Sequence, residues 1–193
     1  MVKKKVAVLV SGGGTNLQAL IDAEKEGIIK SGTISLVVSN KESAYALERA
    51  KNADIEGVYI KRGADFEENL INLLNEKKID FIVLAGFLSI LSENFVKKYD
   101  KKIINVHPSL IPSFCGDGFY GLKVHEAALK KGVKVTGATT HFVNEITDGG
   151  EIIMQKAVEI SPDDTPETLQ LKVMQEAEWK ILPLSVEKVC SEM

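Results

Sequence analysis

Short apolar runs alternate with helical patterns along the first half of the chain. The runs are mostly rich in branched side chains, as expected for strands buried on both faces of a sheet, and comprise residues 6–10, 34–39, 57–60, 81–84 and 103–106. Between them apolar residues recur three and four positions apart, as on one side of a helix, over residues 17–26, 65–77 and 91–99. A further helix is expected to end near Asn52, and residues 40–43 can cap its start. The alternation predicts a parallel sheet with helices on both faces, joined by right-handed crossovers.

The second half of the chain has a different pattern. Two longer strand patterns, 133–143 and 151–160, are separated by a turn-rich loop, and we expect them to pair antiparallel at one edge of the sheet. The segment 113–121 is dense in glycine and aromatic residues, which predicts a mobile loop before a short helix. A final helix is expected over residues 168–190, and Pro183 is expected to kink or split it.

The composition is that of an ordinary globular protein, with 45% hydrophobic and 26% charged residues. At roughly 100–200 residues per domain, residues 1–193 are expected to form a single domain. The net charge of −3 gives no support to nucleic-acid binding. No apolar run approaches the roughly 20 residues of a membrane span, and the run at 6–10 is too short for a signal peptide. Cys115 and Cys190 lack the spacing of a zinc site or a disulfide scaffold, which fits a cytoplasmic protein.

The fifth strand pattern ends in two polar residues whose side chains are expected to lie on the same face. Asn105 and His107 are two positions apart, so on an extended backbone they share one face. An amide can stabilise an oxyanion and an imidazole can move a proton near neutral pH, a combination that suits acyl transfer. Further along, Asp148 precedes two glycines. We expect Asn105, His107 and Asp148 to meet in one cleft, where the carboxylate would raise the pKa of His107.

Each of these residues also has a plainer interpretation. His107 could be a loop histidine that binds a backbone carbonyl, and Asp148 stands in a common turn sequence. His125, in the helix after the glycine-rich loop, is expected to be a surface or packing residue. His141 lies within a strand pattern and is expected to be buried, either as a packing residue or as a support to the site. The histidines and the carboxylate do not form a credible ligand set, so no metal is expected.

The segment SGGGTN, residues 11–16, joins the first strand to the first helix. Glycine allows close approach of a ligand to the backbone, and a helix N-terminus offers unpaired N–H groups, which favours a phosphate. Leu17 stands where a dinucleotide fingerprint needs glycine, and no GKS or GKT follows as in a P-loop. A phosphorylated small molecule is therefore favoured over a dinucleotide, and the alternative is a tight strand–helix turn.

Four stretches together resemble one family, the phosphoribosylglycinamide formyltransferases, which are folate-dependent enzymes of purine synthesis. The stretches are SGGGTNLQALIDA, LAGFLSIL, IINVHPSLIPSF and HFVNEITDGGEII, and the resemblance extends from Val6 to about Val186. It implies a Rossmann-like α/β fold with a mostly parallel sheet and antiparallel edge strands. The implied reaction moves the formyl group of 10-formyltetrahydrofolate to the amine of 5-phosphoribosylglycinamide, without a metal. Expected partners are these small molecules, with no nucleic acid or membrane, and the chain is expected to be a monomer or a homodimer.

The resemblance also implies roles for individual residues. The catalytic residues would be Asn105, His107 and Asp148. The ribonucleotide would be bound by Gly13, Gly14, Thr15, Asn16, Gln175 and Glu178. Folate would be bound by Arg62, Leu88, Ser89, Ile90, Leu91, Asn105, Val143, Asn144, Glu145, Ile146 and Thr147. Two positions depart from the family: Ser89 replaces a basic residue found in several members, and the family's arginine near the folate tail falls at Arg62 or Gly63.

Related functions remain as alternatives. Formyl transfer to initiator methionyl-tRNA would need an additional C-terminal domain, and a formyltetrahydrofolate hydrolase would have an N-terminal regulatory domain. Sugar-nucleotide formyltransferases are also larger. A non-catalytic phosphate-binding module would use the glycine loop and the sheet but would give Asn105, His107 and Asp148 no role.

Overall fold

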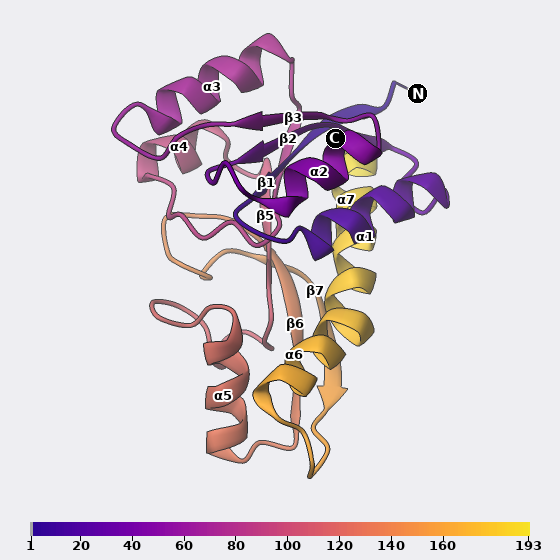
Figure 1. Ribbon diagram of the computed structural model, residues 1–193, viewed down its shortest axis with the longest axis vertical. Coiled ribbons are helices and arrows are strands. Elements are labelled where there is room, and N and C mark those ends of the chain that lie inside the picture. Colours follow the sequence, from indigo (N-terminus) through magenta and orange to yellow (C-terminus); the bar gives the residue numbers. More distant parts are fainter. Residues whose placement is uncertain (1) are drawn as a thin grey trace.

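The computed structural model describes residues 2–193, which form a seven-stranded mixed sheet in the order β3-β2-β1-β4-β5-β6-β7 (Figure 1). The strands are β1 (Lys4–Val10), β2 (Gly32–Ser39), β3 (Glu56–Tyr59), β4 (Phe81–Leu84), β5 (Ile103–His107), β6 (Val135–Phe142) and β7 (Ile152–Glu159). The first five strands pair in parallel, whereas β6 is antiparallel to both β5 and β7. The predicted mostly parallel sheet with antiparallel strands at one edge is confirmed.

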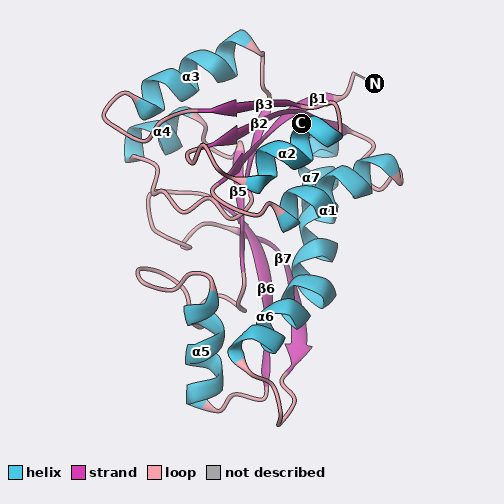
Figure 2. Cartoon of the chain, viewed as in Figure 1, coloured by secondary structure: helices cyan, strands magenta, loops and turns pink. Residues whose placement is uncertain are grey.

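Helices cover both faces of the parallel part (Figure 2). They are α1 (Thr15–Lys25), α2 (Tyr45–Asn52), α3 (Phe66–Glu76), α4 (Glu93–Lys98), α5 (Leu122–Lys131), α6 (Pro166–Val173) and α7 (Trp179–Glu192), with a π-helical turn η1 (Met174–Glu178) between the last two. Buried side chains of α1, α2 and α7 pack on one face of the sheet, and those of α3 and α4 pack on the other. Helices α5 and α6 lie beside β6 and β7.

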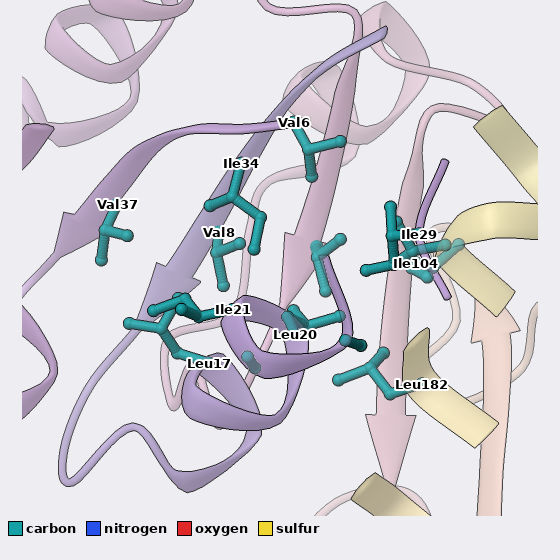
Figure 3. Close-up of a cluster of buried hydrophobic side chains, with 14 of the residues drawn as sticks. Val6, Val8, Leu17, Leu20, Ile21, Ile29, Ile34, Val37, Ile104 and Leu182 are labelled. Carbon is teal, nitrogen blue, oxygen red and sulfur yellow. The ribbon is translucent and has the colours of Figure 1, made fainter. Parts of the chain in front are cut away.

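The continuous apolar run in β1 follows from this two-sided burial. Val6, Val8 and Val10 pack against α1, α2 and α7, whereas Ala7 and Leu9 face α3 and α4. Figure 3 shows the first of these two clusters, where side chains of α1 and α7 meet the strands. Because successive side chains of a strand point to opposite faces, a strand covered on both sides needs apolar residues at every position.

One expectation about the helices is wrong, and a second is wrong in part. The cap expected within residues 40–43 is absent from α2, whose N-cap is Ala44, a residue with no polar side chain. Asn40 instead donates from Nδ2 to Ser89 Oγ, 2.7 Å away in the loop after β4. Pro183 does not split the last helix, because α7 is helical through that proline, and a kink there stays a prediction. The α-helical hydrogen-bond pattern is instead interrupted upstream, at the wider π turn η1.

The segment 113–121 forms a series of turns that leads into α5. Its expected mobility remains a prediction. Among residues 2–193, no helix combines the length and apolar character that a bilayer crossing requires.

Candidate active site

A cavity of about 630 Å³ lies at the carboxyl ends of the central strands. Its walls come from the loop after β4 (86–91), the end of β5 (105–108), the glycine-rich loop (116–121) and the β6–β7 loop (143–148). The strand order reverses between β1 and β4, where sequential connections leave in opposite directions. Open α/β sheets bind ligands at such a reversal, outside the carboxyl ends of the strands. The fold therefore puts the cavity where a ligand site is expected.

The structure brings Asn105, His107 and Asp148 together in this cavity and adds His141. Asp148 lies between the two imidazoles: His107 Nδ1 is 3.5 Å from its Oδ2, and His141 Nε2 is 3.5 Å from its Oδ1. His141 lies directly opposite Asn105 in the β5–β6 pair, and Asn105 Nδ2 donates to His141 Nε2 at 3.2 Å. The antiparallel pairing of β6 with β5 thus adds a second histidine to the cluster.

Backbone carbonyls determine which ring nitrogens bear protons. His107 donates Nε2–H to the carbonyl oxygen of Phe114 at 2.9 Å, and His141 donates Nδ1–H to that of Phe142 at 2.9 Å. Because a carbonyl oxygen only accepts, these bonds select one tautomer of each neutral ring. The remaining nitrogens, His107 Nδ1 and His141 Nε2, both face Asp148.

Asp148 acts on the pKa of His107 in the expected upward direction, but the net shift is downward. Burial lowers the pKa of His107 below its usual value, and this outweighs the opposite effects of the Asp148 charge and the bond to Phe114. For Asp148, burial alone would raise the pKa, but interactions with His141, the Gly116 N–H and His107 together lower it. Asp148 is therefore ionised near neutral pH, next to a largely neutral His107.

The glycine-rich segment 113–121 contacts the cluster formed by Asn105, His107, His141 and Asp148. The carbonyl oxygen of Phe114 accepts a hydrogen bond from His107, and the backbone N–H of Gly116 donates to Asp148 Oδ2 at 2.9 Å. Asp117, Phe119 and Tyr120 line the cavity. The sequence indicated a loop here but assigned none of these contacts, because backbone groups of any residue type can make them.

His125 is packed on the buried side of α5, as one of its two expected alternatives has it, but it is also found at the site, which was not expected. It is buried, lines the cavity, and both of its ring nitrogens lack a hydrogen-bond partner among residues 2–193. Burial, with a smaller effect from His107, lowers the pKa of His125 to about 4. The signal in the sequence was its place on the buried side of α5, beside Val124 and Ala128.

The predicted folate residues line the cavity with one exception, Arg62. The loop after β4 contributes Leu88, Ser89, Ile90 and Leu91, and the β6–β7 loop contributes Val143, Asn144, Glu145, Ile146 and Thr147. Three of these are apolar side chains with large exposed fractions, Leu88 at 56%, Ile90 at 81% and Ile146 at 64%. Arg62 instead lines a neighbouring cavity of about 280 Å³ that shares Ser89, Ile90 and Leu91 with the main one.

The predicted ribonucleotide residues divide into two groups. Asn16 and Glu178 line the cavity, and Asn16 Nδ2 donates to Glu178 Oε2 at 2.7 Å. Burial raises the pKa of Glu178 to about 7, although the bond from Asn16 acts in the opposite direction. In the described part of the chain, the cavity walls do not include Gln175, which is exposed, or the three residues Gly13, Gly14 and Thr15.

Packing against α2 explains why residue 14 is a glycine, a reason that the sequence did not reveal. Its φ is +71°, and a Cβ added there would lie 2.7 Å from Ala46 Cβ and 2.9 Å from Ala46 Cα. The close approach of α2 therefore requires glycine at this position, whether or not a phosphate binds. Gly13 has no such neighbour: among residues 2–193 no atom lies within 4 Å of a Cβ added there.

Residues 2–193 contain no group of three or more His, Cys, Asp or Glu side chains that could bind a metal ion.

Comparisons with known proteins agree with this geometry. A family model described as formyl transferase matches residues 4–186. The human trifunctional purine biosynthetic protein adenosine-3 is 44% identical over 194 residues, which cover 98% of this chain and 18% of that protein. Phosphoribosylglycinamide formyltransferase of Haemophilus influenzae is 40% identical over 188 residues, covering 95% of this chain and 85% of the relative.

A solved structure gives the same result. The crystal structure of phosphoribosylglycinamide formyltransferase from Anaplasma phagocytophilum has a TM-score of 0.90 at 40% identity, covering 99% of this chain and 89% of the other. The chain spans less than a fifth of the human protein. Because the family model covers nearly all of the described residues, the chain belongs to the formyl transferase family.

Proposed function

We propose that this protein transfers the formyl group of 10-formyltetrahydrofolate to the amine of 5-phosphoribosylglycinamide. The products would be formylglycinamide ribonucleotide and tetrahydrofolate, as a step of purine synthesis. The observation that supports this most directly is the convergence of Asn105, His107 and Asp148 on one cavity. The relatives named above are phosphoribosylglycinamide formyltransferases or a purine biosynthetic protein, which supports the same substrate pair.

The reaction needs a carbonyl oxygen to become negative and a proton to change place. The amine nitrogen forms a bond to the formyl carbon, and the carbonyl electron pair moves to oxygen. Asn105 would donate a hydrogen bond to this oxyanion, and His107 would donate a second one from Nε2–H in place of its bond to the Phe114 carbonyl, each worth about 2.7–4 kcal/mol in comparable sites. When the tetrahedral intermediate collapses, the bond from the formyl carbon to the folate nitrogen breaks, and the proton lost by the amine is transferred to that nitrogen.

The cluster offers a path for this proton. Asp148 is ionised and 3.5 Å from His107 Nδ1, so a proton accepted at either group stays within the same pair. His107 is largely neutral because it is buried. Negative charge that develops on the formyl oxygen would favour the protonated form of His107, since an adjacent opposite charge raises an imidazole pKa. His107 would thus gain positive charge at the step that needs it.

The two substrates would enter from different walls. The exposed apolar side chains Leu88, Ile90 and Ile146 suit the flat ring system of a folate. Asn16 and Glu178 offer polar groups on the α1 side of the cavity, next to the glycine loop, for the ribonucleotide. Arg62 lines the adjoining smaller cavity and would contact a part of the folate that extends past Ser89.

A spectrophotometric assay tests the proposal. Purified protein is mixed with 10-formyltetrahydrofolate, with and without 5-phosphoribosylglycinamide, and product folate and formate are measured. We expect tetrahydrofolate to form only when the ribonucleotide is present, in equal amount to formylglycinamide ribonucleotide. Formate release without an acceptor would instead show a hydrolase, and ribonucleotide binding without turnover would show a binding module.

A further inference from the structure

Helix α2 orients the glycine loop that precedes α1, residues 12–14, by donating hydrogen bonds to the carbonyl groups of that loop. The backbone N–H of Ala46 donates to the Gly12 carbonyl oxygen at 3.1 Å, and Arg49 Nε donates to the Gly13 carbonyl oxygen at 2.8 Å. Arg49 is itself fixed, because Nη1 donates to Gln18 Oε1 at 3.0 Å and the guanidinium carbon lies 5.1 Å from the ring centre of Tyr45. Two successive carbonyls are therefore turned toward α2.

The direction of these carbonyls determines the direction of the next N–H groups. In a trans peptide the C=O and N–H bonds point to opposite sides. The N–H groups of Gly13 and Gly14 therefore point away from α2. Helix α1 begins at Thr15, so the N–H groups of its first turn are free of helical bonds. Within residues 2–193, no backbone acceptor is hydrogen-bonded to the N–H groups of residues 13–16.

A second observation indicates that a ligand belongs at this place. Asn16, in the first turn of α1, is only 8% exposed and lines the cavity, and its Oδ1 has no hydrogen-bond partner in the described chain. A buried amide oxygen without a partner is costly unless a ligand or water satisfies it. Because an amide oxygen accepts hydrogen bonds and an ionised phosphate donates none, this oxygen would bind a hydroxyl or N–H group of the ligand, while the phosphate would bind the free N–H groups of the same turn.

We propose that Arg49 is a positioning residue for the phosphate of the ribonucleotide. Its bond to the Gly13 carbonyl turns the following N–H of Gly14 toward the phosphate, and its positive charge lies behind that peptide. It acts through the backbone of the glycine loop. This inference rests on the proposed function, because it takes the bound anion to be the phosphate of 5-phosphoribosylglycinamide.

The test compares two acceptors that differ only in the phosphate. Initial rates are measured for wild type and Arg49→Met with 5-phosphoribosylglycinamide and with the dephosphorylated ribosylglycinamide. For the phosphorylated acceptor we expect KM to rise about tenfold while kcat stays within about twofold, as for loss of one charge-assisted interaction made equally in ground and transition states. For the dephosphorylated acceptor we expect an unchanged kcat/KM. Arg49→Lys, which keeps the charge and one donor, should give an intermediate KM.

Lys51→Met is the matched control, because Lys51 is an exposed basic residue of the same helix. It should leave both acceptors unaffected. Equal loss of kcat/KM for both acceptors in Arg49→Met would show that Arg49 only stabilises the packing of α1 and α2, and an unchanged KM would also overturn the proposal. If Arg49→Met does not fold, the same comparison with Arg49→Lys decides between these outcomes.

Failure of the proposed function would be distinguishable from failure of this inference. If the wild type shows no turnover, calorimetric titration with the two acceptors still measures the preference for the phosphate. We expect wild type to bind the phosphorylated acceptor more tightly and Arg49→Met to lose most of that preference. Equal preference in both proteins would refute the role of Arg49 whatever the reaction is.

Discussion

One carboxylate at the centre of the site interacts with two histidines. Each ring also donates to a backbone carbonyl, so the rings keep their orientation independently of Asp148. Asp148 itself has a left-handed backbone, with φ of 54°, and receives the N–H of Gly116. Replacing its charge should therefore change the chemistry of the cluster more than its shape.

Asp148→Asn tests this at the level of the reaction. We expect turnover to fall by at least about a hundredfold, because an acid–base group of this kind contributes about 10²–10⁴ in rate. His107→Ala should have a similar effect. Circular dichroism and the thermal midpoint should remain close to wild type. Glu151→Gln is the control, since Glu151 is an exposed carboxylate at the end of the same loop. Near-normal turnover of either site variant would show that the catalytic residues are assigned wrongly.

Glu178 should make stability depend on pH. Its pKa is about 7 in the folded protein against an ordinary value of 4.5, because burial disfavours the carboxylate. The unfolded chain thus ionises first, so this group's contribution is complete below pH 4.5 and is lost as the pH rises toward 7. The full loss is roughly 3 kcal/mol.

Denaturant unfolding of wild type and Glu178→Gln across this pH range measures the effect. As the pH rises, the free energy of unfolding of wild type should fall relative to that of Glu178→Gln, by roughly 3 kcal/mol in all. A difference that is constant with pH would mean that Glu178 ionises in the folded protein as it does in the unfolded chain.

At the scale of elements, the contact between α1 and α2 depends on one glycine. Gly14 has positive φ and also has Ala46 against the position of its missing Cβ. Gly27, at the end of α1, has nearly the same φ of +74°, but among residues 2–193 no atom lies within 4 Å of an added Cβ. Alanine at position 27 would therefore add backbone strain alone, whereas alanine at position 14 would add the same strain and a steric overlap with Ala46.

Gly27→Ala should cost about 1 kcal/mol in the free energy of unfolding, the usual price of a left-handed alanine. Gly14→Ala should cost about 2 kcal/mol more, because α2 must move or the loop must change its path. Chemical denaturation of both variants checks this difference. Equal costs would mean that α2 yields without penalty.

At the scale of the whole molecule, shared strands and a shared helix connect three apolar clusters in residues 2–193. Neighbouring residues of one strand belong to different clusters, as Ile103 and Ile104 do. In α7, Ile181 packs with β6, β7 and α6, whereas Leu182 packs under the parallel strands. No cluster can be exposed without disrupting an element that another cluster needs.

We therefore expect the chain to unfold in a single transition, as one domain. Fluorescence of Trp179, the first residue of α7, should report the same midpoint as far-ultraviolet circular dichroism. Two separate midpoints, with the Trp179 signal changing first, would show that β6, β7 and α6 unfold as an independent unit.

The interruption of the last helix shows where prediction from sequence fails. Pro183 was the visible helix breaker, yet the break lies at Met174–Glu178, which contains good helix formers. A π turn forms there, and its register buries Glu178 and leaves Gln175 exposed, although at helical spacing the two would share a face. Local propensity does not encode this, because the register of that turn depends on what it packs against.

The sequence by itself determined the order and type of the elements except for the π turn η1, the mostly parallel sheet and the residues Asn105, His107 and Asp148. These follow from hydrophobic periodicity, which is local, and from short motifs at strand ends. Only the tertiary structure decided that burial lowers the pKa of His107 despite Asp148, that His125 faces the cavity, and that Arg49 binds the Gly13 carbonyl. Burial and contacts between distant segments arise only when the chain is packed, so no pattern along it can report them.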